Sequence, residues 1–403
     1  MKLSRYIYVL IIFFAAISMY FGIRNGLIVG GILICSLIYS MIHSNLKGNL
    51  RLNQIDILII FFIFYNIFTG LFLLIGHLPI SVFLSEIANS IIPISMYFFS
   101  KKYKFKDFDI FYKVFVISLI VVIISGLYYN LTLSDPFYLS YLERAYPNFH
   151  IIGFRLYPRL TSWIGSVAIG VLSLGGLLLT YYRLSISAIN KKIGFSLVTI
   201  FTISILLSMQ RSAIFALVFI LLYIVKRVKV DRLFTFRNLS FFFVISTFMI
   251  GSFVVFYPEF TSSLFDRFSN IFTAISERNL DWLLVFDNNK MLLFGNGLGS
   301  GGHRAIEYQE IIADGNYFKM LYEIGIFGII TFIVIIINVL FHKIPSKKAT
   351  FKLAILIFLF QAIGSNVLTF QISAILFWFY IGLVYNKNLD SLGTKNYEKD
   401  NSI

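Results

Sequence analysis

Apolar residues occur along this chain in long stretches that short polar segments separate. A membrane-spanning helix needs about 20 mostly apolar residues, and twelve stretches reach or approach that length. They cover residues 6–23, 26–42, 55–75, 80–99, 110–131, 161–182, 193–208, 212–225, 238–257, 316–341, 350–368 and 372–385. We therefore expect an all-α integral membrane protein with about twelve transmembrane helices in a single polytopic domain, residues 1–403.

The composition excludes a water-soluble fold. Of the 403 residues, 58% are hydrophobic and only 13% are charged, whereas soluble domains carry roughly 25% charged residues. No soluble fold of this length could hide so much apolar surface in one core. The only cysteine, Cys35, lies inside an apolar stretch, so the chain cannot form an internal disulfide.

The basic residues are unevenly distributed between alternate polar segments. With the N-terminus inside, the inner segments hold 23 Lys and Arg residues and the outer segments hold 9. Cytoplasmic loops of membrane proteins carry an excess of these residues. The distribution therefore predicts that both termini are cytoplasmic, and the formal charge of +15 reports membrane topology. We expect no nucleic-acid partner.

Two segments on the outer side are long, residues 132–160 and residues 258–315. Long connections in compact proteins are often functional. In the second, apolar residues recur at helical spacing over residues 261–275. This pattern predicts an amphipathic helix, which either lies at the outer membrane interface or packs on the bundle as a lid.

The densest polar region lies at the end of the second long segment, where glycines recur. Gly297, Gly299 and Gly302 satisfy the spacing G-x-G-x-x-G. A dinucleotide site would need strands on both sides of a helix, and this chain offers none. Two interpretations are open. The glycines let backbone amides converge on an anion, or they form a flexible hinge.

His303 and Arg304 follow the glycines directly, and Asp314 precedes the next apolar stretch. A histidine near its usual pKa can take a proton from an attacking hydroxyl, but a histidine in a loop is also commonly just solvated. Asp314 can act in the same way or cap the helix that follows. Glu323 is costly to bury in an apolar helix, so we expect it to face a polar cavity or a partner. Arg304 is a candidate to line the same cavity.

Three arginines lie at the outer membrane boundary, Arg159, Arg211 and Arg278. Each could simply extend its charged end into water. Arg211 is the strongest functional candidate, because a short outer turn has no topological use for a positive charge. Arginines grouped beside a lipid surface suit a lipid-linked phosphate or pyrophosphate, since the guanidinium matches phosphate oxygens and stays charged.

Polar residues also occur inside the apolar stretches, among them Asn66, Glu86 and Asn89. They could line a water-filled path, as in a transporter, or join helices by hydrogen bonds. No metal-binding motif occurs in the sequence, so we expect neither a metal nor another cofactor.

Four of these segments resemble a known family. They are RLTSWIGSVAIG from Arg159, LLSMQRSAIFAL around Arg211, SERNLDWLLVFDNNKMLLFGNGLGSGG with Arg278 and the glycines, and DGNYFKMLYEIGIFG from Asp314. Together with the twelve stretches and the late outer loop, they resemble the bacterial O-antigen polymerases and O-antigen ligases, which are membrane glycosyltransferases. Ligase-type members have a histidine where Asp314 falls, which favours the polymerase branch.

The resemblance implies oligosaccharide repeat units on undecaprenyl pyrophosphate as substrates. These would be joined at the periplasmic face of the bacterial inner membrane by a GT-C-like helical protein with two periplasmic loops. Arg159, Arg211 and Arg278 would hold pyrophosphates, and His303 or Asp314 would accept the proton. A flippase and a chain-length regulator of the same pathway are the implied partners. An O-antigen ligase that transfers polysaccharide to lipid A core, and a polysaccharide flippase or transporter, are the alternatives.

Overall fold

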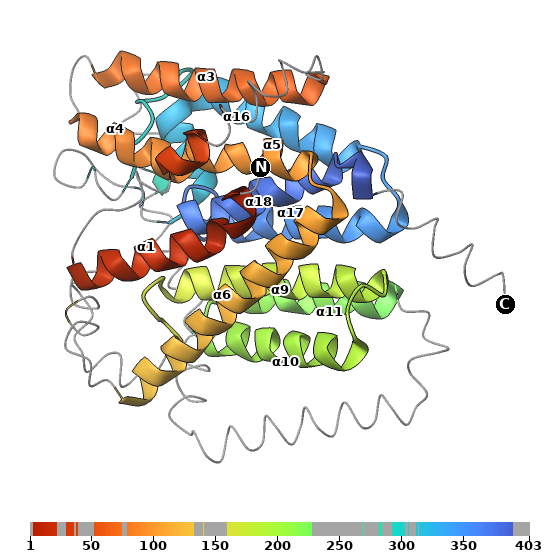
Figure 1. Cartoon of the computed structure of the whole chain (residues 1–403). Helices are drawn as coiled ribbons and strands as arrows, with labels where there is room; N and C mark the ends of the chain where they lie inside the picture. The colour runs from red at the N-terminus through yellow and green to blue at the C-terminus, as the bar shows by residue number, and fades with distance from the viewer. Residues whose placement is uncertain are drawn as a thin grey trace.

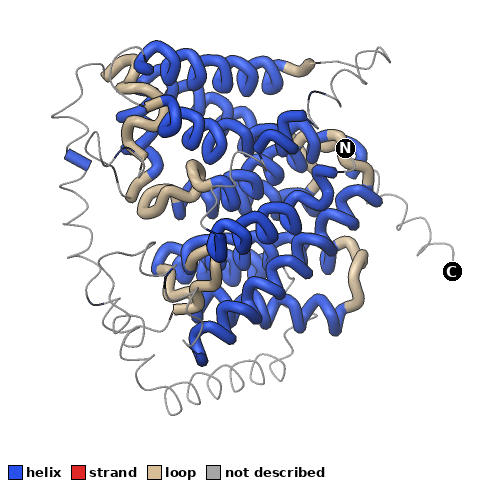
Figure 2. Tube along the Cα trace, turned by 60° about the vertical axis from the view of Figure 1, so that its left-hand side comes forward, coloured by secondary structure: helices blue, strands red, loops and turns tan. Residues whose placement is uncertain are grey.

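Every regular element in the described part of the chain is a helix (Figure 2). The structure is a computed structural model that describes residues 3–21, 30–35, 38, 52–74, 79–132, 140, 159–227, 269, 282–283, 292–302, 305, 312 and 314–389. The predicted helices at 26–42 and 238–257, and the amphipathic segment 261–275, lie mostly or wholly outside these residues.

Five α-helices and three short helices of other types are described over their full length between residues 3 and 132. The α-helices are α1 (Ile7–Phe21), α3 (Gln54–Leu74), α4 (Ile80–Glu86), α5 (Ser95–Lys101) and α6 (Phe105–Thr132). The 3-10 helix η1 (Leu3–Tyr6) precedes α1, and the π-helix η2 (Ile87–Ile91) and the 3-10 helix η3 (Ile92–Ile94) join α4 to α5.

The rest of the chain, from residue 159 onward, contains six α-helices among the described residues. They are α9 (Ser166–Ser185), α10 (Lys191–Leu207), α11 (Arg211–Arg227), α16 (Asn316–Phe341), α17 (Ala349–Gln361) and α18 (Gln371–Val384). Two 3-10 helices flank the last pair, η5 (Ser346–Lys348) and η6 (Lys387–Leu389).

Within the part of the chain that the structure describes, five helical segments are long and apolar enough to cross a membrane. They are Gln54–Leu71, Ile80–Lys101, Phe105–Tyr129, Ser166–Ser185 and Asn316–Phe341. Leu3–Ile17, Arg211–Ile224 and Gln371–Val384 are apolar but shorter. The prediction of an all-α protein with apolar helices that can span a membrane is confirmed for the described residues.

Two of the predicted stretches extend more than one turn beyond their helices, and both errors lie at polar turns. The stretch 350–368 was expected to be one helix, but α17 ends at Gln361. The chain turns there because Asn316 binds the next segment, accepting from the Leu368 amide at 2.8 Å and donating to Thr369 Oγ1 at 3.0 Å. The stretch 161–182 begins its helix later than expected, at Ser166.

Helix α9 lies at the centre of one half of the bundle. Figure 1 shows α9, α10 and α11 side by side, with α6 crossing them obliquely. The Tyr112 and Thr180 hydroxyls of α6 and α9 lie 3.0 Å apart, and the Tyr380 hydroxyl of α18 donates to the Gly175 carbonyl at 2.7 Å. Buried hydroxyls thus join α9 to its neighbours within an otherwise apolar core.

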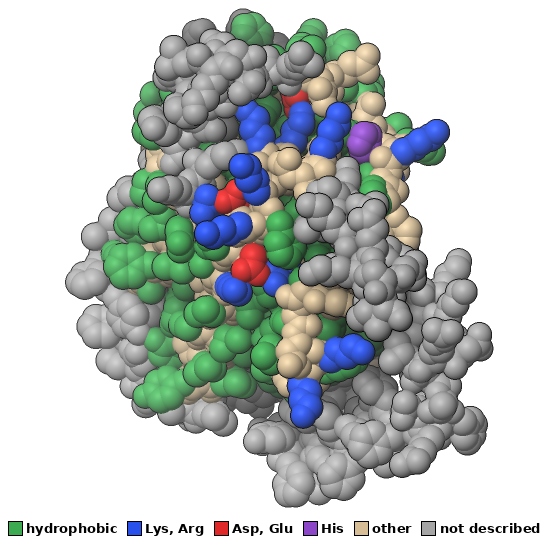
Figure 3. All heavy atoms as spheres, turned by 45° about the vertical axis from the view of Figure 1, so that its right-hand side comes forward, with side chains coloured by type: hydrophobic (Ala, Val, Ile, Leu, Met, Phe, Trp, Pro, Cys, Tyr) green, Lys and Arg blue, Asp and Glu red, His purple; other side chains and the backbone are tan. Residues whose placement is uncertain are grey.

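One end of the bundle, which we call the lysine-rich end, carries Lys102, Lys191, Lys343, Lys348 and Lys387 at helix termini and turns. Figure 3 shows Lys and Arg side chains gathered on this face, with few Asp or Glu between them. Partial burial, together with the neighbouring ammonium of Lys101, lowers the pKa of Lys102. The opposite end, which we call the loop end, holds Arg159, Arg211 and the glycine-rich segment 292–302.

Candidate functional site

Arg159 and Arg211 belong to separate segments that the fold brings to the loop end. The Leu160 amide donates to the Leu207 carbonyl at 2.9 Å, so the segment that begins at Arg159 lies beside the end of α10. The turn after Leu207 leads to Arg211, which is the first residue of α11. Two of the three predicted arginine positions therefore share one end of the bundle.

The backbone around these two arginines is locally strained. Ser162 and Met209 both have φ of 50°, and they are two of the three non-glycine residues with positive φ in the described part of the chain. Such residues cost free energy and cluster at functional sites. Here they hold the two tight turns that present Arg159 and Arg211.

Residues close to the two arginines in the sequence carry buried polar atoms without partners. The amide oxygen and nitrogen of Gln210, the Trp163 indole nitrogen and the Ser212 hydroxyl are buried and make no hydrogen bond to a described residue. Gln210 itself is only 9% exposed. An unsatisfied buried polar group costs about 1–3 kcal/mol, so a group of them beside two cations suggests that they bind a ligand. We call Arg159, Trp163, Gln210, Arg211 and Ser212 the arginine site.

Gly170 of α9 fixes the position of the Gln210 side chain. A Cβ built at Gly170 would lie 2.5 Å from Gln210 Oε1 and 3.0 Å from Ser208 Oγ. Only a glycine lets the turn approach α9 so closely. The arginine site is thus packed directly against the first turns of α9.

The second polar region is a break in α16. Gly325 has φ of 66° and ψ of −171°, which interrupts the helix after its ninth residue. A broken helix leaves backbone carbonyls and amides without their usual partners, which is tolerated in a membrane protein only where other protein groups or water replace them.

The segment 292–302, which we call the glycine loop, supplies those partners. The Asn296 and Gly297 amides donate to the Tyr322 and Glu323 carbonyls at 2.7 and 2.8 Å. On the other side of the break, the Ile326 amide donates to the Leu292 carbonyl at 3.0 Å. The glycine loop and α16 therefore form one hydrogen-bonded unit at the loop end.

Three charged residues lie together beneath the glycine loop. The Lys319 ammonium of α16 lies 2.8 Å from Glu86 Oε1 of α4 and 3.7 Å from Glu323 Oε1. All three side chains are almost fully buried. The Ser90 hydroxyl donates to the Glu86 carboxylate. We call Glu86, Lys319 and Glu323 the buried charge cluster.

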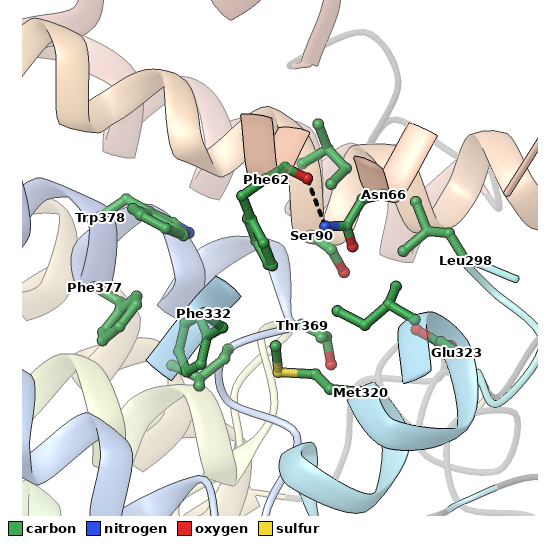
Figure 4. A pocket seen from close by; sticks show the side chains of 13 residues that line it. Phe62, Asn66, Ser90, Leu298, Met320, Glu323, Phe332, Thr369, Phe377 and Trp378 are labelled. Atoms are coloured by element: carbon green, nitrogen blue, oxygen red, sulfur yellow. Dashed lines mark hydrogen bonds between the residues drawn. The ribbon is translucent and has the colours of Figure 1, made fainter. Parts of the chain in front are cut away.

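A small cavity of about 30 Å³ lies beside this cluster, and Glu323 lines it. Figure 4 shows Asn66, Ser90 and Thr369 around the cavity, with aromatic rings at its other side. The Asn66 amide group is already used, because it donates to the Phe62 carbonyl at 2.7 Å. The space would accept one or two water molecules. It is too small for a sugar.

Asp314 lies one residue before the capping position of α16. The helix begins at Asn316, and Gly315 occupies the capping position without a side-chain hydrogen bond. The main chain of Asp314 is held by Trp282, whose indole nitrogen donates to the Asp314 carbonyl at 2.8 Å. The capping position of α16 therefore belongs to Gly315, and Asp314 directly precedes it.

Three other predicted site residues, Arg278, His303 and Arg304, lie outside the described residues. Arg304 therefore stays a prediction as a cavity-lining residue. The described part of the chain contains no group of three or more metal-binding side chains.

Sequence reasoning missed two residues of these regions, Lys319 and Gln210. A signal existed for Lys319, because Lys319 and Glu323 are four residues apart in a helix and so lie on one face. No pattern marks Gln210, since its isolation depends on the packing of α9. No protein-family model and no curated protein sequence matches this chain.

Proposed function

We propose that the protein is an O-antigen polymerase, a metal-independent membrane glycosyltransferase that joins undecaprenyl-pyrophosphate-linked oligosaccharide repeat units. The observation that carries this proposal is the arginine site. Two cations from separate segments, Arg159 and Arg211, lie at one end of the bundle beside buried polar groups without partners. Guanidinium groups suit pyrophosphate oxygens, and the neutral polar groups suit the attached sugar.

The membrane arrangement follows from the charges. The lysine-rich end is cytoplasmic and the loop end periplasmic, in agreement with the positive-inside rule. About twelve helices in a GT-C-like arrangement would cross the inner membrane, with both termini in the cytoplasm. The arginine site then lies at the level of the outer lipid headgroups, where a lipid-linked pyrophosphate would be found.

In the proposed reaction, a hydroxyl at the non-reducing end of one repeat unit attacks the anomeric carbon of the sugar that another carrier holds. The bond between this carbon and the pyrophosphate oxygen breaks, and undecaprenyl pyrophosphate leaves with the electron pair. The hydroxyl proton passes to His303 or Asp314. Arg159, Arg211 and Arg278 stabilise the charge that develops on the leaving pyrophosphate.

The buried charge cluster favours a second candidate function, a polysaccharide transporter. Intramembrane charges and broken helices mark the substrate paths of transporters, and Glu86, Lys319, Glu323 and Gly325 provide both features. The cavity beside them is small, however, and the cluster is internally paired. An O-antigen ligase uses the same lipid carrier and is the third candidate.

One gel distinguishes the polymerase from the other two candidates. Lipopolysaccharide from cells that lack the gene is separated by size and compared with that of complemented cells. A polymerase defect leaves lipopolysaccharide with one repeat unit, whereas a ligase or flippase defect leaves none. Lipopolysaccharide without any repeat unit would contradict the proposed polymerase.

Gln210→Met is expected to keep or raise the thermal stability and to lower activity. Met has a similar shape and removes an amide whose burial costs about 1–3 kcal/mol. An amide both donates and accepts, as sugar hydroxyls do, whereas a phosphate oxygen only accepts. We therefore assign Gln210 to the sugar next to the pyrophosphate. Losing one or two hydrogen bonds should reduce polymer synthesis about 10-fold, measured with purified protein.

Gln361→Met is the matched control. Gln361 is also fully buried, and neither of its amide atoms has a partner among the described residues, but it lies at the end of α17 outside the arginine site. Its replacement should leave polymer synthesis unchanged. Wild-type activity in Gln210→Met, or equal losses in both variants, would show that Gln210 does not contact the substrate.

A further inference from the structure

The buried charge cluster joins two helices that are far apart in the sequence. Glu86 closes α4, whereas Lys319 and Glu323 lie in the first part of α16, before the break at Gly325. The single ammonium of Lys319 contacts both carboxylates. The cluster therefore ties the loop-end part of α16 to α4 through one side chain.

The glycine loop lies directly on this cluster. The Gly301 amide donates to Glu323 Oε1 at 3.2 Å. A Cβ built at Gly302 would lie 3.3 Å from Glu86 Oε2 and 3.8 Å from Lys319 Nζ, and a Cβ at Gly299 would lie 3.3 Å from Glu86 Cβ. The backbone of residues 299–302 thus covers both carboxylates and the ammonium at contact distance.

The cluster is poorly suited to a purely stabilising role. Removing charges from water costs several kcal/mol for each ion, and a buried ion pair is often no more stabilising than apolar side chains of the same volume. The cluster also has one ammonium for two carboxylates, so its positive charge does not match the number of acidic groups. What such a cluster does provide is a specific arrangement, because charge-assisted hydrogen bonds are short and directional.

We propose that Lys319 is a positioning residue. Held between Glu86 and Glu323, it fixes the glycine loop, whose next two residues in the sequence are His303 and Arg304. The effect on catalysis rests on the proposed function, in which His303 is a candidate proton acceptor. The fixation of the loop by the cluster does not depend on that function.

The test compares the wild-type protein with a neutral triple variant, Glu86→Gln, Lys319→Met and Glu323→Gln. Amide hydrogen exchange of the peptide that covers residues 292–302 is measured in the full-length protein. Thermal stability and the kcat and KM of polymer synthesis are measured in parallel. The matched control is the variant Asp56→Asn with Lys101→Met, which removes the buried ion pair of 2.6 Å at the lysine-rich end.

We expect the triple variant to unfold near the wild-type temperature. It loses the attraction between the charges, but it also loses the cost of burying them. Exchange of the glycine loop should become about 10-fold faster, the scale of one charge-assisted hydrogen bond. The kcat should fall about 10-fold while KM changes less than about twofold, because the arginine site still binds the lipid-linked substrate. The control should alter none of these values.

Unchanged exchange of the glycine loop in the triple variant would overturn the proposal, whatever the activity. Faster exchange with wild-type kcat would also overturn it. The cluster would then hold the glycine loop, but holding the loop would not affect catalysis. If the wild-type protein makes no polymer, the proposed function fails, while faster exchange would still establish that the cluster holds the loop. If the triple variant does not fold, Glu323→Gln alone replaces it in the test. This milder variant keeps the Lys319–Glu86 pair and an acceptor for the Gly301 amide. Its expected increase in the exchange rate of the glycine loop is smaller.

Discussion

Arg211→Ala should abolish polymer synthesis while the protein still inserts into the membrane. The guanidinium group is the strongest candidate to stabilise the leaving pyrophosphate, and loss of one such group in a site that excludes water costs about 10²- to 10³-fold in rate. The variant is expressed in cells that lack the gene, and the length distribution of their lipopolysaccharide is determined. Only one-unit lipopolysaccharide is expected, at a normal amount of membrane-bound protein.

Two further variants make this result specific. Arg211→Lys keeps the charge but loses the planar pair of donors, so it should restore only a small part of the polymer. Lys192→Ala removes an exposed cation at the lysine-rich end and should leave the polymer unchanged. Polymer of wild-type length in Arg211→Ala would refute the assignment of Arg211 to the pyrophosphate.

The positions of the described helices could be predicted well from the sequence, because the length of each apolar stretch indicates a helix. The stretch predicted at 316–341 matches the bounds of α16. The stretch predicted at 80–99 lies within Ile80–Lys101, although no pattern of residues marked its π-helix and 3-10 turn. Errors occurred at polar turns, such as the one after α17, where Asn316 binds Leu368 and Thr369.

The break in α16 could not be predicted from the local pattern. Gly325 lies in a continuous apolar stretch, where an isolated glycine is compatible with an ordinary helix. The break depends on the glycine loop, which supplies amides and carbonyls from residues 292–297 to both sides of Gly325. A pairing between backbone groups carries no side-chain signature, so only the three-dimensional fold shows it.

The candidate site was predicted in part. Arg159 and Arg211 could be chosen from the sequence because outer loops contain few cations, but their common location depends on the hydrogen bond between Leu160 and Leu207. Glu323 was expected to need a polar partner, and Lys319 and Gly301 now provide it. That Glu86 belongs to the same cluster could not be derived, since it lies more than 200 positions earlier in the chain.

Gly295→Ala and Gly325→Ala should each destabilise the protein severely. Gly295 and Gly325 have φ of 80° and 66°, a region that costs other residues about 1–2 kcal/mol. A Cβ at Gly295 would lie 2.5 Å from the Glu323 carbonyl, and a Cβ at Gly325 would lie 2.5 Å from the Gly295 nitrogen. These are backbone atoms that cannot move aside, so overpacking adds about 1–3 kcal/mol. Thermal unfolding of the purified protein measures the loss.

The double variant gives the more informative result. Both substitutions disrupt the same crossing of two backbones, so the second should add little to the first, whereas independent sites would give additive losses. Gly31→Ala is the control, since a Cβ there meets no atom within 4 Å and alanine favours a helix over glycine by about 1 kcal/mol. Additive losses for Gly295→Ala and Gly325→Ala would mean that the glycine loop and the break in α16 are stabilised separately.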